Sequence, residues 1–176
     1  MLSRPKQRLS GFTLVEILVV VVILGIASAI IIPQIGSRDD LVASAASRAL
    51  MADLVYAQNR AIATQKKHFV QFTGQQYTLL ARDSDASALY TLTHPINKTP
   101  YAFTFGTARS ALENSSLTST NFGGPTILGF DELGSPFSYD GTTSTSLVNS
   151  GTIVITSGAA SLTIAVEPFT GELSVQ

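Results

Sequence analysis

Glu16 is the residue whose type and position most demand a chemical explanation. It is the fifth residue of an apolar run that extends from Phe12 to Ile32. A carboxylate near the centre of a membrane costs about 2.5–3.5 kcal/mol on insertion scales. The residues before the run, Arg4, Lys6 and Arg8, carry three positive charges and no negative one. Simple membrane anchoring therefore leaves Glu16 unexplained.

Other side chains that could perform chemistry are few. The chain has 176 residues, no cysteine and two histidines, His68 at an expected strand start and His94 before Pro95. Neither histidine lies in a catalytic or metal-ligand pattern, so both are interpreted as exposed strand-edge or turn residues. The acidic pairs at 83–85 and 131–132 are interpreted as turn residues, since a cation needs six or more oxygen ligands. We expect no enzymatic activity, no metal and no cofactor.

The apolar run has three possible interpretations. Its 21 residues would form a helix of about 30 Å, the thickness of a bilayer's hydrocarbon core. A secretory signal peptide would have a shorter core and a cleavage site, which Ala27-Ser28-Ala29 could supply. A plain single-pass anchor, with its basic flank on the cytoplasmic side, has the right length but leaves Glu16 unexplained.

The third interpretation explains Glu16. The stretch "GFTLVE", residues 11–16, resembles the processing site of type IV pilins and type II secretion pseudopilins. The resemblance implies that a prepilin peptidase cleaves between Gly11 and Phe12 and methylates the new amino-terminal Phe12. It also implies that Glu16 pairs with the terminal amine of a neighbouring subunit. A carboxylate that finds its cation only in the assembled fibre would make assembly favourable.

The same resemblance divides the chain into three parts. Residues 1–11 would be a cleaved leader, 12–36 the transmembrane half of a long helix, and 37–176 a soluble periplasmic domain. Pro33 falls where pilins commonly carry a helix proline, and we expect it to kink the helix because it removes a backbone donor.

The soluble part shows a change of hydrophobic period. Apolar residues recur at helical spacing from Val42 to Ala61, which predicts an amphipathic helix to about Gln65. Its charged residues Arg48, Asp53 and Arg60 are interpreted as a solvated outer face. Strands are then predicted in this order: 68–73, 76–81, 89–93, 101–105, 126–130, 152–156, 162–166 and 172–175. Residues 134–151 are interpreted as a mobile loop. The predicted fold class is α+β, a long amino-terminal helix packed on antiparallel sheets.

Two stretches of the soluble part resemble a subgroup, the GspH/FimT-like minor pseudopilins. They are "LMADLVYAQNRAIATQKKHFVQFTGQQYTL", covering the helix end and first hairpin, and "LTIAVEPFTGELSVQ", a closing hairpin with Gly171 at its turn. Residues 83–150 show no comparable resemblance. The implied function is that of a structural subunit near the tip of a periplasmic pseudopilus in type II protein secretion. Its implied partners are other pseudopilins or pilins through the helix, the prepilin peptidase and the bacterial inner membrane.

The alternative function is that of a minor type IV pilin in pilus assembly or DNA uptake. Charge argues against nucleic acid as a partner. From Phe12 onward, 8 basic residues (11 minus 3) face 12 acidic ones, a net charge of −4. No Lys or Arg follows Arg109. DNA binding depends on several cations that neutralise phosphates. The sequence has only one basic cluster, formed by Lys66, Lys67 and Arg60, and a solvated helix end explains it.

Overall fold

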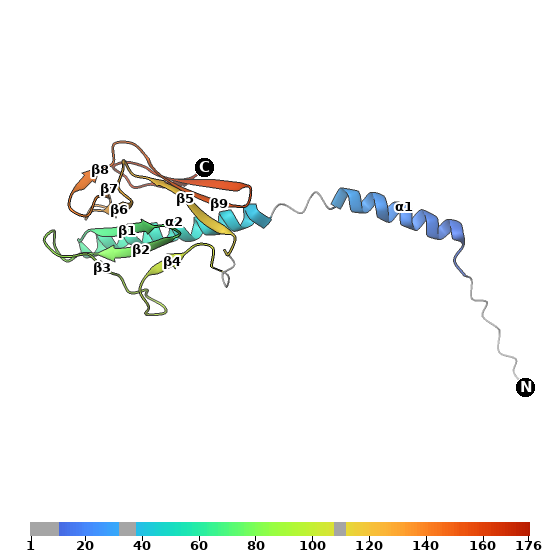
Figure 1. Ribbon diagram of the computed structural model, residues 1–176, viewed down its shortest axis with the longest axis horizontal. Coiled ribbons are helices and arrows are strands. Elements are labelled where there is room, and N and C mark those ends of the chain that lie inside the picture. Colours follow the sequence, from blue (N-terminus) through green and yellow to red (C-terminus); the bar gives the residue numbers. More distant parts are fainter. Residues whose placement is uncertain (1–10, 32–37, 108–111) are drawn as a thin grey trace, which may run out of the picture. The chain divides into compact units, whose positions relative to one another are not determined.

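The chain forms two compact units, Met1–Ser37 and Arg38–Gln176. The structure, a computed structural model, describes residues 11–31, 38–107 and 112–176. Helix α1 (Leu14–Ile31) lies in the first unit (Figure 1). Helix α2 (Arg38–Thr64) and all strands of the described residues lie in the second.

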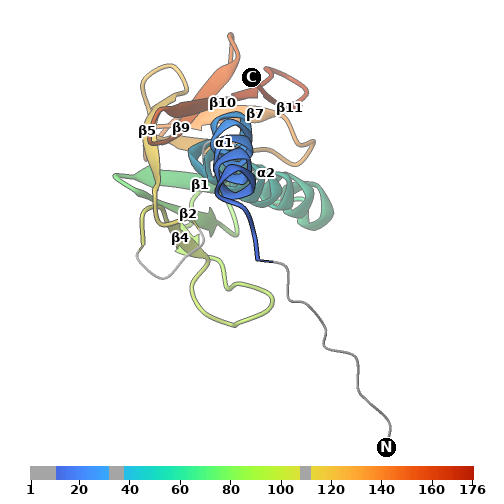
Figure 2. The same cartoon turned by 90° about the vertical axis from the view of Figure 1, so that its right-hand side faces the viewer.

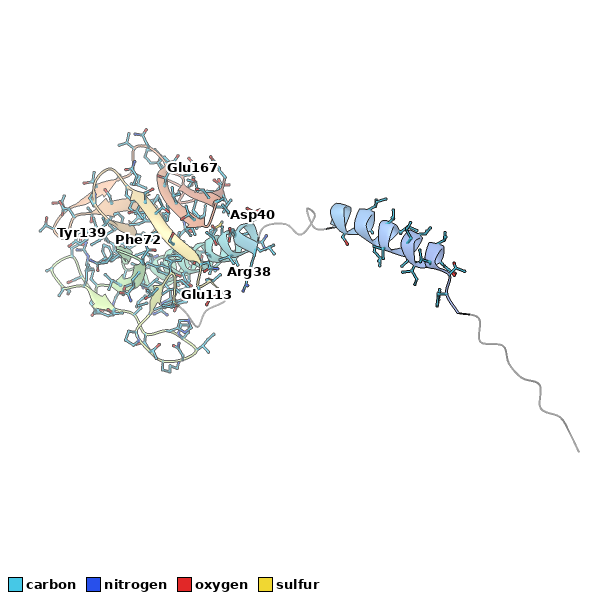
Figure 3. The ribbon with its side chains drawn as sticks, turned by 45° about the vertical axis from the view of Figure 1, so that its right-hand side comes forward. Arg38, Asp40, Phe72, Glu113, Tyr139 and Glu167 are labelled. Atoms are coloured by element: carbon cyan, nitrogen blue, oxygen red, sulfur yellow. The ribbon has the colours of Figure 1, made fainter. Side chains whose placement is uncertain are left out.

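Helix α1 is apolar on every side. Its large side chains from Leu14 to Ile26 are 46–83% exposed, and Figure 3 shows them projecting around the helix. A helix with no polar face is typical of apolar surroundings. Among the described residues, no helix has both the length and the hydropathy that a membrane span requires. The expected span 12–36 and the expected kink at Pro33 extend into residues 32–37, which lie outside the described residues.

Helix α2 confirms the predicted amphipathic helix and its end. Its buried face has the 3–4-residue spacing that the sequence predicts, and small side chains such as Ala46, Ala57 and Ala61 let strands approach closely. The helix ends in a Schellman motif. There Gln65 adopts a left-handed φ of 51°, and the Lys66 amide donates to the Ala61 carbonyl at 3.3 Å.

The larger sheet begins with the predicted hairpin. Strands β1 (His68–Thr73) and β2 (Gln76–Ala81) pair antiparallel around Gly74, which has a φ of 58°. The sheet order is β3-β2-β1-β6-β7-β8, with β4 also pairing with β2. The remaining bounds are β3 Tyr90–Thr91, β4 Ala102–Thr104, β6 Ile127–Phe130, β7 Pro136–Tyr139 and β8 Ser144–Ser146.

The smaller sheet has the order β11-β10-β9-β5 and is antiparallel throughout. Its bounds are β5 Ser115–Asn121, β9 Gly151–Ser157, β10 Ala160–Val166 and β11 Leu173–Val175. Figures 1 and 2 show β5 and β9 on one side of α2 and β2 and β4 on the other. The Gln75 side chain joins the two sheets. Its amide donates to the Leu117 carbonyl at 2.9 Å and accepts from the Leu117 amide at 2.7 Å, so it pairs with the edge of β5 as a strand would.

One main core fills the space between α2 and the sheets. It combines Leu50 and Leu54 of α2 with Leu128, Ile153 and Ile164 from the strands, all fully buried. Phe72, labelled in Figure 3, contacts Phe122 with ring centroids 5.7 Å apart. A second, smaller cluster on the larger sheet contains Phe69, Phe137 and Tyr139.

The structure corrects two expectations about strands. The predicted mobile loop 134–151 contains β7 and β8, and all four residues of β7 are buried. Strand β5 was not predicted, because its sequence, SSLTSTN, is polar. It is stabilised instead by pairing with β9 and by hydroxyl contacts, such as Ser116 Oγ to Thr156 Oγ1 at 2.8 Å. The strands predicted at 89–93, 101–105, 126–130, 152–156, 162–166 and 172–175 all coincide with observed strands.

Candidate functional site

The predicted cleavage junction lies outside regular structure. Gly11, Phe12 and Thr13 precede α1 and belong to neither a helix nor a strand, and Phe12 is 78% exposed. A peptide bond held in a helix is committed to backbone hydrogen bonds. The Gly11–Phe12 bond is not, so it is open to an enzyme that approaches along the chain.

Thr13 and Glu16 form a capping box at the start of α1. The Glu16 amide donates to Thr13 Oγ1 at 3.2 Å, and the Thr13 amide lies 3.4 Å from Glu16 Oε2. The Ile17 amide donates to the Thr13 carbonyl at 3.2 Å, which makes Thr13 the N-cap residue. This reciprocal pattern satisfies two amides that the first helical turn leaves without partners. The sequence signal for this capping box is the T-x-x-E spacing of residues 13–16, which was not among the predicted features.

The capping box gives the Glu16 carboxylate a fixed location. It lies in the first turn, where the helix macrodipole favours a negative charge. Cleavage after Gly11 would create an amine at Phe12, one residue before the N-cap. The amino-terminal turn can therefore present a carboxylate and an amine close together within an apolar helix. Cleavage at Gly11, methylation at Phe12 and pairing by Glu16 stay predictions.

Asp53 was predicted to lie on a solvated face, and this prediction is wrong. It is half-buried, and its carboxylate accepts hydrogen bonds from Tyr77 Oη at 2.5 Å and from Tyr101 Oη at 2.8 Å. The pKa of the Tyr77 hydroxyl is raised well above its usual range, chiefly because the hydroxyl is buried and secondly because the negative charge of Asp53 lies beside it. Asp53 thus links α2 to the larger sheet. Arg48 and Arg60 are exposed, as expected.

The two histidines differ in their surroundings. His68 was expected to be exposed but is only 2% exposed, and its Nδ1–H donates to the Lys66 carbonyl at 2.8 Å. Burial lowers the pKa of the His68 imidazole. His94 is partly exposed in a turn, where its Nδ1 accepts from the Ile96 amide at 3.2 Å. Neither histidine contacts a nucleophile or an orienting carboxylate in these interactions, which is consistent with a structural role.

The acidic and basic residues near the end of α2 pair with one another. Lys66 contacts Asp83 at 2.7 Å, Lys67 contacts Asp85 at 3.0 Å, and the largely buried Arg82 contacts Asp85 at 2.6 Å. The Arg82 guanidinium also lies 5.2 and 5.3 Å from the ring centroids of Phe69 and Tyr139. The described residues contain no group of three or more His, Cys, Asp or Glu that could hold a metal.

The amino-terminal segment and the fold each have counterparts among known proteins. Residues 6–32 match the family described as the prokaryotic N-terminal methylation motif. The α+β fold, a helix packed on antiparallel sheets, confirms the predicted fold class.

The fold has counterparts among solved structures. The fold is similar to two solved structures of the minor pseudopilin EpsH from the type 2 secretion system of Vibrio cholerae. Each has a TM-score of 0.53, with 14% and 13% identity over 76% and 77% of this chain and 95% and 94% of the EpsH chains. The chain is also 60% identical over 35 residues to the type II secretion system core protein G of Pseudomonas aeruginosa. That match covers 20% of this chain and only a quarter (25%) of the Pseudomonas protein. The chain thus shares the fold of the minor pseudopilin EpsH.

Proposed function

We propose that the chain is a minor pseudopilin, a structural subunit near the tip of a periplasmic pseudopilus in type II protein secretion. The observation that carries the proposal is the amino-terminal turn. Thr13 caps a largely apolar helix whose one charged residue, Glu16, is the fifth residue after the predicted cut. The similarity in fold to a minor pseudopilin supports the same role.

In this proposal the amino-terminal segment performs both anchoring and assembly. A prepilin peptidase cleaves between Gly11 and Phe12 and methylates Phe12. Residues 12–36 hold the subunit in the bacterial inner membrane, and the domain from residue 37 onward lies in the periplasm. In the fibre, Glu16 pairs with the terminal amine of a neighbouring pseudopilin. Pairing removes the cost of an isolated carboxylate in apolar surroundings, so assembly is favoured.

The charge arrangement supports a structural role over DNA binding. Lys66 and Lys67, two members of the basic cluster, contact Asp83 and Asp85 at 2.7 and 3.0 Å. A lysine paired with a carboxylate contributes less to phosphate neutralisation, and that neutralisation supplies most of the affinity for DNA.

The test separates the charge of Glu16 from its capping role. Glu16→Gln keeps a side-chain oxygen that can accept from the Thr13 amide but loses the charge, whereas Thr13→Val loses the N-cap hydroxyl and keeps the charge. Each full-length variant is produced in the host cell, and its recovery with other pseudopilins is measured after membrane extraction. Amounts of processed chain in the membrane serve as the control.

The proposal predicts that Glu16→Gln and Glu16→Ala both lower co-recovery by about tenfold or more, since one partner of a desolvated ion pair is lost. Thr13→Val should retain most of it. If Glu16→Gln matched the unaltered chain while Thr13→Val failed to assemble, Glu16 would act only as a helix cap. The proposed pairing would then be wrong.

A further inference from the structure

Two turns of the second unit meet at one residue of helix α2. The turn at 131–135 joins β6 to β7, and the turn at 167–172 joins β10 to β11. Gln58 Nε2 donates to the Gly134 carbonyl at 2.9 Å and to the Thr170 carbonyl at 3.2 Å. The packing is close, because a Cβ added at Gly171 would lie 2.8 Å from the Gly134 carbonyl oxygen. Gln58 thus fixes the position of both turns.

The surface around Gln58 exposes large apolar side chains. Leu133 is 83% exposed and Phe169 is 73% exposed, one on each turn. Val55 and Ile62 of α2, three residues before and four after Gln58, are 40% and 44% exposed. This spacing puts them on the same helix face as Gln58. A single exposed apolar side chain is ordinary, but four around one fixed point make a patch of the kind that marks interaction sites. We name these four residues the Gln58 patch.

Phe169 adds an observation that packing does not explain. Its φ is 67°, in the left-handed region that bulky side chains rarely adopt. The ring gains little burial in return, since most of it is exposed. A strained conformation that carries an exposed aromatic side chain is typical of binding positions, and rigid aromatic residues are common anchors at protein interfaces.

The two turns that contribute to the Gln58 patch carry charges of one sign. The same two turns carry Asp131, Glu132, Glu167 and Glu172, and neither contains a lysine or arginine. Glu167, labelled in Figure 3, follows β10. Three basic side chains line the same surface pocket as Glu132, and all three are paired with Asp83 or Asp85: Lys66, Lys67 and Arg82. A partner that fits is apolar at its centre and basic at its rim, and the acidic rim disfavours an anionic membrane.

We propose that the Gln58 patch is a docking surface for a folded protein partner that presents an apolar socket bordered by lysine and arginine, with Phe169 as the anchor. This contact is separate from the helical contacts through Glu16.

The test places a photoreactive p-benzoylphenylalanine at position 133 of the full-length chain in its host cell. Cross-linked peptides are sequenced to identify the partner residues. Three further substitutions are combined with the probe: Phe169→Ser, Glu172→Lys, and Ile96→Ser as the matched control. Ile96 is 85% exposed and lies in the turn before Pro100, outside both turns of the patch. Circular dichroism and limited proteolysis check that each variant is folded.

The proposal expects one partner site, apolar with neighbouring Lys or Arg. Phe169→Ser should lower the cross-link yield about tenfold or more, as removal of an interface anchor does. Glu172→Lys should lower it severalfold, and Ile96→Ser should leave it unchanged. Cross-links to lipid, cross-links to an acidic surface, or a yield that Phe169→Ser does not alter would each overturn the docking surface. If Glu16-dependent co-recovery persisted in any of those cases, the proposed function would stand.

Discussion

Replacing Asp53 by alanine should destabilise the second unit by about 3–4 kcal/mol. A hydrogen bond to a charged group contributes about 1.5–3 kcal/mol when its partner is buried. Asp53 accepts two such bonds, from Tyr77, which is 1% exposed, and from Tyr101, which is 7% exposed. In Asp53→Ala the Tyr77 hydroxyl would lose its hydrogen-bond partner and could not reach water instead, so the loss of this bond should cost about 2–3 kcal/mol. The Tyr101 hydroxyl lies nearer to solvent, so the loss of its bond to Asp53 should cost only about 1 kcal/mol.

Two further variants separate the contribution of the Asp53–tyrosine hydrogen bonds from that of general packing. Asp53→Asn keeps an oxygen that accepts from one tyrosine and an NH₂ that donates to the other, so its cost should be about 1–2 kcal/mol. Tyr77→Phe alone leaves a half-buried carboxylate that water can reach. The double variant Asp53→Ala with Tyr77→Phe should therefore cost less than the sum of the single variants by at least about 1 kcal/mol.

The assay is urea unfolding of the full chain in detergent, followed by tyrosine fluorescence, since the sequence contains no tryptophan. The slope m must stay constant for the midpoints to be compared as free energies. A loss of less than about 1 kcal/mol for Asp53→Ala, or additive effects of the two substitutions, would refute the reasoning.

Three other predictions use the same unfolding assay. The pKa of His68 is lowered in the folded chain, so the unfolded chain binds more protons and the free energy of unfolding should fall as the pH drops below about 6.5. His68→Gln should abolish this fall in stability between pH 7 and 5. A variant whose pH profile matched that of the unaltered chain would contradict the prediction. Gly129→Ala should cost about 1–3 kcal/mol, because the new methyl overlaps the Phe137 ring; an unchanged midpoint would contradict that packing. Phe169→Gly should leave stability unchanged or raise it by up to about 1 kcal/mol by relieving the positive φ; a clear loss would show that the ring supports the fold.

The sequence predicted those parts of the fold that depend on local pattern. Helical spacing from Val42 to Ala61 identified α2 and its buried face, and Gly74-Gln75 identified the first hairpin. The closing hairpin also follows its prediction, with Gly171 at a φ of 67° in the turn. In each case neighbouring residues in the chain determine the structure, so a short window contains the signal.

The parts that were missed depend on partners distant in the sequence. Strand β5 is polar and is held by β9 and by the Gln75 side chain. Asp53 was assigned to solvent because its partners, Tyr77 and Tyr101, lie 24 and 48 residues away. His68 was expected at an exposed strand edge or turn, yet it is buried at the start of β1, next to the second core. No periodicity reports such tertiary contacts.

The candidate site shows the same division. Gly11, Phe12 and Glu16 were predicted as site residues from their order along the chain, and Thr13 could have been predicted in the same way from the capping-box spacing. The Gln58 patch could not, since it combines a helix with two turns that are brought together by folding. A positive φ at Phe169 has no sequence signal, because the residue type is unsuited to it.

The most direct test of the central claim is intact-mass analysis with amino-terminal sequencing of the chain recovered from host membranes. Cleavage by a prepilin peptidase predicts a chain that begins at Phe12 and carries a methyl group on its terminal amine. A chain that begins at Ile30, after Ala27-Ser28-Ala29, would instead identify an ordinary signal peptide. Cleavage at that position would remove Glu16 from the mature protein and contradict its proposed role in assembly.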